Sequence, residues 1–111
     1  MATDKTPSED YLGFVEIFRG VRPDIETGSM FGMRCMKRGG KAFAGGFAGG
    51  LVVKLAPEAL ARAAALTHAT EFDPSGGGRP MKAWIVLGSE HQDRWQEYAE
   101  AAYAAVEATG R

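Results

Sequence analysis

The one cysteine of the chain, Cys35, stands among cationic residues in the stretch Met33-Arg34-Cys35-Met36-Lys37-Arg38. Neighbouring cations lower the pKa of a thiol and so favour the reactive thiolate. Alternation along a strand, however, puts Cys35 on the same face as Phe31 and Met33, the face that we expect to be buried. The pattern therefore favours a structural cysteine over a reactive or redox-sensing one.

Other catalytic and metal-binding patterns are weak in this sequence. The glycine run 45–50 (GGFAGG) lacks the Gly-Lys-Ser/Thr that completes a phosphate-binding loop, so we interpret its glycines as hairpin residues. His68 and His91 stand apart from each other, from Cys35 and from any carboxylates at ligand spacing. We therefore expect no metal site, no cofactor and no enzymatic activity.

Cationic and aromatic residues fall at matching positions of the expected strands. On the strand near 81–87, Lys82 and Trp84 alternate with aliphatic residues, and Lys54 does so on the strand that ends at Leu55. If the aliphatic side chains face the helices, the opposite face carries the candidate binding residues Arg34, Lys54, Arg79, Lys82 and Trp84. Cations beside an aromatic ring suit a nucleic-acid stacking platform or an anionic ligand. The alternative is that the third helix or a second subunit covers Trp84.

The length and the charge of the chain bear on these candidates. The chain has 111 residues, enough for one domain that folds without disulfide bonds or bound metal, and its net charge is −1. Residues 29–88 nevertheless carry eight bases against three acids, whereas both ends of the chain are acidic. A local basic surface is therefore compatible with the overall charge. With one cysteine and no leader-like or membrane-spanning segment, we predict a cytoplasmic protein.

The pattern predicts an α+β domain in the order helix, three-strand meander, helix, two strands, helix. Its centre is residues 29–55, where apolar residues recur mostly at every second position and Gly39-Gly40 and Gly49-Gly50 supply hairpin turns. We expect residues 21–28 to be a loop, residues 70–73 a brief extended segment and residues 81–87 a strand.

Three amphipathic or capped segments predict the helices. Thr6 and Pro7 begin the first, which ends near Gly20, and Ala56-Pro57-Glu58 begin the second. Ser89 caps the third. The apolar faces of the first and third helices are expected to pack on the sheet, and they consist of Tyr11, Phe14, Val15 and Phe18, and of Trp95, Tyr98, Ala102 and Val106.

Four short motifs resemble the N-terminal domain of the TfoX/Sxy family of competence regulators. They are Met30-Phe31-Gly32, Lys41-x-Phe43-Ala44, Leu51-x-x-Lys54-Leu55 and Phe72-x-Pro74 with Pro80-Met81-x-x-Trp84. The resemblance covers essentially the whole chain, so residues 1–111 are expected to be one such domain. It implies a curved antiparallel sheet packed against helices, no established enzymatic activity and an association with transcriptional regulation. Because no second, helical domain follows residue 111, we expect a stand-alone member.

Two functions follow as hypotheses. The first is a binding or regulatory module that acts by protein–protein contact as a homodimer, with the Trp84 face of the sheet or the last helix as its interface. The second is a nucleic-acid-binding module that uses the basic and aromatic sheet face, whose affinity must then fall steeply with salt.

Overall fold

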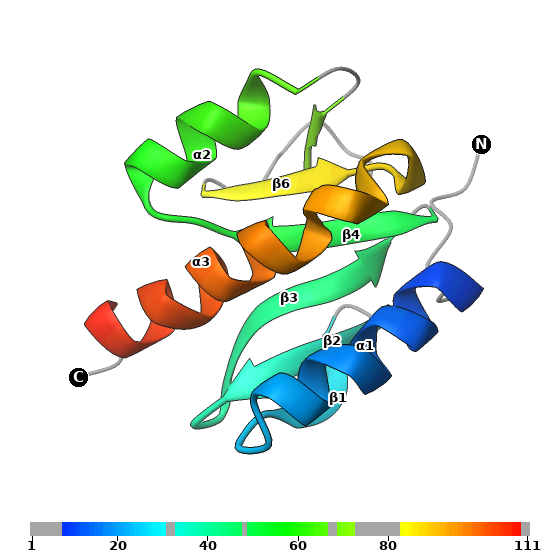
Figure 1. Cartoon of the computed structure of the whole chain (residues 1–111). Helices are drawn as coiled ribbons and strands as arrows, with labels where there is room; N and C mark the ends of the chain where they lie inside the picture. Colours follow the sequence, from blue (N-terminus) through cyan, green and yellow to red (C-terminus); the bar gives the residue numbers. More distant parts are fainter. Residues whose placement is uncertain (1–7, 31–32, 48, 67–68, 73–82, 110–111) are drawn as a thin grey trace.

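The computed structural model describes residues 8–30, 33–47, 49–66, 69–72 and 83–109. It confirms the α+β class, with helices packed on a six-stranded sheet in which every pairing of neighbours is antiparallel (Figure 1). In chain order the elements are α1 (Glu9–Val21), β1 (Glu26–Met30), β2 (Met33–Arg38), β3 (Lys41–Phe47), β4 (Gly50–Lys54), α2 (Pro57–Ala64), β5 (Thr70–Glu71), β6 (Trp84–Leu87), the 3-10 helix η1 (Ser89–Arg94) and α3 (Trp95–Thr109).

The strands lie in the order β1-β2-β3-β4-β6-β5, so the predicted meander has four strands rather than three. Its glycine turns are confirmed, because Gly39, Gly40 and Gly49 have φ values of 59°, 81° and 80°, which residues with a side chain rarely adopt. The expected loop at 21–28 is wrong in its second half, where β1 begins at Glu26. This edge strand has the sequence ETGSM, without apolar alternation, and backbone pairing with β2 alone defines it.

Two of the three helices begin at residues other than those predicted. Ser8, not Thr6, is the N-cap of α1, and its hydroxyl accepts a hydrogen bond from the backbone N–H of Tyr11 at 3.1 Å. The second helix has the predicted proline in its first turn. Ser89 does not cap α3 directly, because η1 intervenes and His91 departs from helical geometry at φ −107° and ψ 22°.

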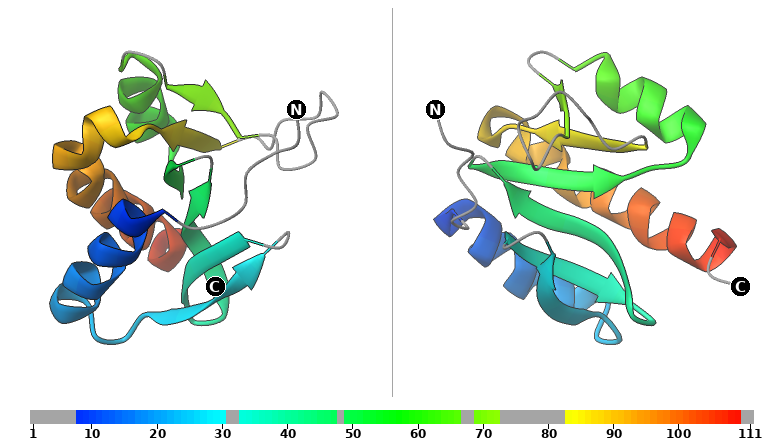
Figure 2. Two further views of the ribbon diagram at one scale, coloured as in Figure 1. Left: turned by 90° about the vertical axis from the view of Figure 1, so that its right-hand side faces the viewer. Right: turned by 180° about the vertical axis from the view of Figure 1, so that it is seen from behind.

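The main core lies between the sheet and the helices, and α1 and α3 lie on the same side of the sheet (Figure 2). Both predicted helix faces are buried there. The strands contribute the alternating positions that the sequence assigned to this face, namely Leu51, Val53, Leu55, Ile85 and Leu87. Phe43 is fully buried and contacts both helices, since its ring centroid lies 6.1 Å from that of Phe18 and 5.8 Å from that of Tyr103.

A second, smaller apolar cluster lies on the opposite face of the sheet. Phe72, directly after β5, packs at its centre, with its ring centroid 4.9 Å from that of Phe47 and 5.7 Å from that of Trp84. Met33, Val52 and Val86 complete the cluster. Both faces of the sheet are therefore apolar along β4 and β6, and the far face is not the polar surface that alternation alone predicted.

Candidate functional site

Trp84 is 7% exposed, so the expectation that it forms an exposed sheet surface is wrong. The alternation itself was assigned correctly, because Trp84 points away from the helices. The ring is nevertheless covered within its own chain, where Phe72 packs on it. Lys54 pairs with Trp84 across the two strands, and it is exposed.

Arg34 does not share that face. Met33 belongs to the cluster that contains Trp84, whereas Met36 belongs to the main core, so Arg34 alternates onto the helix side of the sheet. There it lines a cavity with Tyr11 of α1. Arg79 and Lys82 lie outside the described residues. Of the candidate binding residues, the structure therefore brings together only Lys54 and Trp84, and it places Arg34 on the opposite face.

Cys35 is buried, at 1% exposure. Burial raises the pKa of its thiol, and the charge of Lys37 opposes that rise more weakly. The neutral thiol is therefore favoured, as a structural cysteine requires. As expected, Cys35 shares a buried face with Met33, and this face lies on the side of the sheet away from the helices, where Cys35 pairs with Gly45 before a bulge between Met36 and Lys37.

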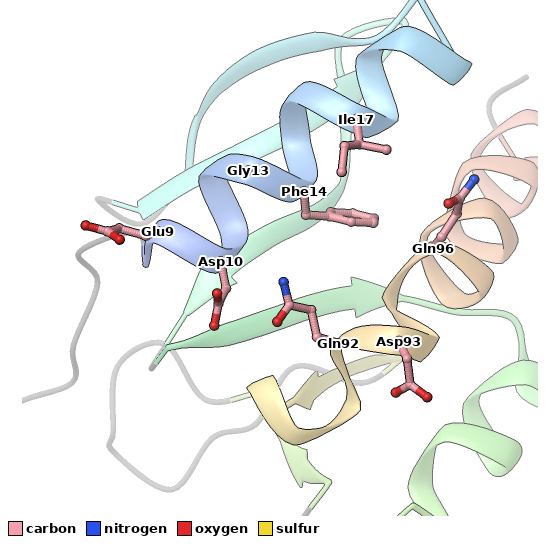
Figure 3. Close-up of a pocket in the computed structure, with 8 residues that line it drawn as sticks. All are labelled: Glu9, Asp10, Gly13, Phe14, Ile17, Gln92, Asp93 and Gln96. Carbon is pink, nitrogen blue, oxygen red and sulfur yellow. The ribbon is translucent and has the colours of Figure 1, made fainter.

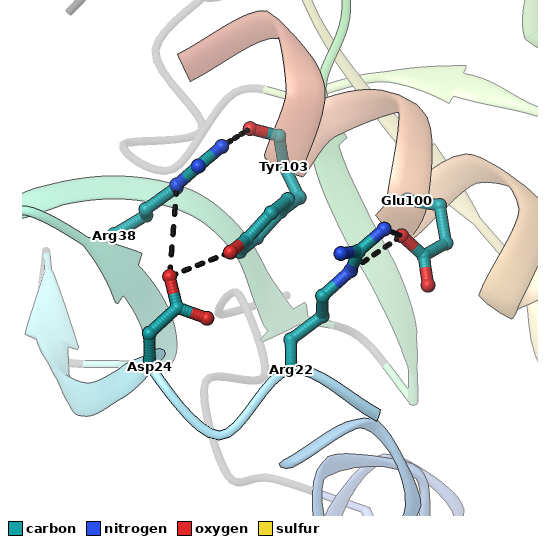
Figure 4. Close-up of polar contacts among 5 residues, drawn as sticks. All are labelled: Arg22, Asp24, Arg38, Glu100 and Tyr103. Carbon is teal, nitrogen blue, oxygen red and sulfur yellow. Dashed lines mark hydrogen bonds and ion pairs between the residues drawn. The ribbon is translucent and has the colours of Figure 1, made fainter. Parts of the chain in front are cut away.

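A polar cluster that sequence reasoning missed joins the end of α1, the end of β2 and the middle of α3 (Figure 4). The Tyr103 hydroxyl donates a hydrogen bond to Asp24 Oδ2 at 2.5 Å, and Arg38 Nη1 donates to the Tyr103 carbonyl at 2.9 Å. Arg22 binds Glu100 Oε1 through Nε and Nη2, at 2.9 and 2.7 Å. Both guanidinium groups also lie against the Tyr103 ring, with Cζ 3.8 Å (Arg38) and 4.7 Å (Arg22) from its centroid.

The hydrogen bonds and charges of this cluster favour an ionised Asp24 and a protonated Tyr103 hydroxyl. The hydrogen bond from Tyr103 lowers the pKa of Asp24, and the two arginines lower it further. The same bond, together with burial, raises the pKa of the Tyr103 hydroxyl, so this group stays a donor. The cluster fastens the loop after α1 to α3. Its members stand up to 79 positions apart, so no local sequence signal indicates it.

Helix α1 carries the apolar side chains that the main core leaves uncovered. Leu12, Ile17 and Val21 are exposed at 47%, 63% and 45%, and they are the exposed large apolar residues of the described part of the chain. The sequence pattern identified the buried face of this helix, but it did not indicate that its outer face is apolar as well.

A groove of about 470 Å³ lies beside this outer face, between α1 and the segment η1–α3. Figure 3 shows Phe14 and Ile17 on the α1 side and the amides of Gln92 and Gln96 on the other. Its charged lining residues are Glu9, Asp10 and Asp93. The groove therefore combines an apolar wall with three carboxylates and no cation.

A second cavity, of about 350 Å³, lies on the other flank of α1, between this helix and strands β1 and β2. Tyr11, Leu12 and Val15 form its helix side, and Thr27 and Arg34 form its strand side. Arg19 also lines it, with Nη1 3.8 Å from Glu16 Oε2 in a solvent-exposed ion pair. Two cations, Arg19 and Arg34, and one carboxylate, Glu16, line this cavity, whereas the charged residues of the groove are all carboxylates.

Comparison of the chain with protein-family models, with curated proteins and with solved structures finds no match. Within the described ranges, no three His, Cys, Asp or Glu side chains gather as a metal site would require. No helix in that part of the chain combines the length and the hydropathy needed to cross a bilayer.

Proposed function

We propose that this chain is a non-enzymatic protein-binding module that forms a homodimer through the flank of α1 that carries Ile17 and Val21. The observation that carries the proposal is that these two residues, two of the three large apolar side chains exposed in the described part of the chain, lie four positions apart on this one helix. Scattered exposed apolar residues are ordinary, but a group of them on one element is typical of an interaction surface.

The spacing of these residues favours a helix as the partner. Gly13, Ile17 and Val21 recur at intervals of four and so form one ridge along α1. A Cβ added at Gly13 would meet no atom within 4 Å, although glycine inside a helix costs roughly 1 kcal/mol relative to alanine. The fold of the monomer does not require this glycine, whereas a second helix that approaches closely would use the space above it.

A second copy of α1 supplies a complementary surface. In an antiparallel pair with its two-fold axis at Ile17, Gly13 of one copy lies opposite Val21 of the other, so a side chain meets a gap. Shape complementarity along this ridge therefore supports a second copy of the chain as the occupant.

The dimer interface proposed here replaces the Trp84 face, which is covered within its own chain. The resemblance to the TfoX/Sxy N-terminal domain stays a prediction, and a regulatory role is part of it. Nucleic-acid binding is the alternative prediction. A stacking platform needs an exposed aromatic ring, and Trp84 does not supply one. Fluorescence anisotropy with mixed-sequence DNA at low and moderate salt tests this alternative directly.

Sedimentation equilibrium over a range of concentrations tests the homodimer. A pair of 13-residue helices forms a small interface, so we expect reversible dimerisation with a Kd on the order of micromolar or weaker. Ile17→Glu should make the protein monomeric at every concentration, since two carboxylates would meet at the two-fold axis. Its far-UV circular dichroism should be unchanged, because Ile17 is 63% exposed.

Leu12→Glu is the matched control, because it introduces the same charge at an exposed apolar residue on the other flank of α1. This variant should dimerise like the wild type. A monomeric wild-type protein at millimolar concentration would exclude a second copy as the occupant. Equal loss of dimer in both variants would exclude the ridge through Ile17 as the interface.

A further inference from the structure

An exposed cation lines the cavity between α1 and strands β1 and β2. Within the described part of the chain, the Arg34 side chain makes no hydrogen bond and no ion pair, and it is exposed to solvent. The second arginine of the cavity, Arg19, has only its 3.8 Å ion pair with Glu16, and the two side chains are 53% and 78% exposed. Such exposed pairs are weak, so an anion in the cavity can compete for Arg19.

Tyr11 supplies an unused hydrogen-bond donor in the same cavity. This residue is 1% exposed, and its ring packs over Gly46, where an added Cβ would lie 2.8 Å from Tyr11 Cγ and Cδ2. Its hydroxyl has no hydrogen-bond partner among the described residues. That part of the chain contains no fully enclosed side-chain oxygen without a partner, so the hydroxyl retains access to solvent, and Tyr11 lines the cavity.

The charge of the cavity favours an anion. Burial raises the pKa of the Tyr11 hydroxyl, so the group stays protonated and able to donate. Cys35 borders the cavity with its side chain on the other face of the sheet, and burial raises the pKa of its thiol, so this neutral group does not repel an anion. Tyr11 packs over Gly46, which follows Gly45, the cross-strand partner of Cys35, so Arg34 and Tyr11 are neighbours on this face of the sheet.

Part of the wall is apolar. Leu12 and Val15 line the helix side together with the Tyr11 ring, whereas Glu16 and Thr27 are polar lining residues. A volume of about 350 Å³ lies in the range of small-molecule sites. A ligand that satisfies both parts of this wall needs an anionic head and a compact apolar body.

We propose that this cavity is a binding site for a small organic acid, with the carboxylate of the ligand held by Arg34 and the Tyr11 hydroxyl and its apolar body placed against Leu12 and Val15. A guanidinium can bind a carboxylate through two parallel hydrogen bonds, and bonds to a charged group are about twice as strong as neutral ones. The site is independent of the homodimer, because Ile17 lies on the other flank of α1.

Titration with benzoate, followed by amide NMR, tests the site. We expect saturable shifts at Thr27, Gly28 and Arg34, with little response to acetate, which lacks the apolar body. Arg34→Gln should weaken binding by about tenfold and Tyr11→Phe by at least about fivefold, because each removes a bond to the charged head. Tyr11→Phe removes a hydroxyl without a protein partner, so its melting temperature should stay at the wild-type value or above.

Lys54→Gln is the matched control, since it removes one positive charge from the opposite face of the sheet, and it should bind benzoate like the wild type. Ile17→Glu should also bind normally. The proposal is overturned if wild-type shifts do not saturate or if Arg34→Gln binds as tightly as the wild type. Benzyl alcohol that binds as tightly as benzoate would overturn the proposal, because it would show an apolar cavity without a carboxylate site. Inorganic phosphate that binds as tightly as benzoate would also overturn it, because it would show a general anion site.

Discussion

Replacing Phe43 by alanine should lower the free energy of unfolding by about 4 kcal/mol. Phe43 is fully buried in β3, a strand paired on both sides by β2 and β4. Removal of a buried phenylalanine costs about 3–5 kcal/mol, and rigid surroundings bring the value toward the upper end. Here the cavity would be bounded by the Phe18 and Tyr103 rings, whose edge and tilted contacts with Phe43 are worth roughly 0.5–1.5 kcal/mol each.

Equilibrium unfolding in urea, followed by tryptophan fluorescence and circular dichroism, measures this loss. With a slope of about 2 kcal/mol per molar urea, the midpoint should fall by roughly 2 M. Lys41→Ala, at an exposed position of the same strand, should stay within about 0.5 kcal/mol of the wild type. Phe47→Ala should cost less than Phe43→Ala, because Phe47 lies in the smaller cluster. A loss below about 1.5 kcal/mol for Phe43→Ala, or a larger loss for Phe47→Ala, would refute the assignment of the main core.

Two further predictions use the same unfolding assay. Gly46→Ala should destabilise by about 1–3 kcal/mol, because its Cβ would lie 2.8 Å from the Tyr11 ring, whereas Gly13→Ala, with open space above it, should stabilise the monomer by about 0.5–1 kcal/mol; similar midpoints would contradict the packing of α1. Tyr103→Phe removes the hydrogen bond that lowers the pKa of Asp24, and this bond adds stability that is fully present above the unfolded pKa near 4 and is lost as the pH falls through the lower folded pKa. The stability difference between Tyr103→Phe and the wild type should therefore be larger at pH 7 than at about pH 2, and a difference that does not change with pH would count against the contact.

Local rules explain what could be predicted of the fold. The buried stripe of α1 follows from helical spacing, and the glycine turns follow from the positive φ that these positions require. Alternation assigned the aliphatic residues of β4 and β6 to the correct face. Strand β1 was missed because its sequence, ETGSM, shows no apolar alternation, and it is defined by its backbone pairing with β2.

The candidate site could be predicted much less well. Alternation correctly aimed Trp84 away from the helices, but it does not say whether that face meets solvent or another part of the chain. Phe72, directly after the two-residue strand β5, packs on the Trp84 ring and covers it. For Arg34 the side was wrong, because Met36 rather than Met33 and Cys35 faces the helices.

By itself, the sequence determined the α+β class, the faces of α1 and α3 that are buried, and the two glycine hairpins. Each of these depends on residues close together in the chain, so periodicity and backbone preference are sufficient. Only the tertiary structure decided that Trp84 is covered, that Tyr103 joins Asp24 to Arg38, and that Arg34 and Tyr11 share a cavity on one flank of α1. These are contacts between distant segments. Their free energy depends on which surfaces meet when the sheet and the helices pack, and no short stretch of the sequence specifies that.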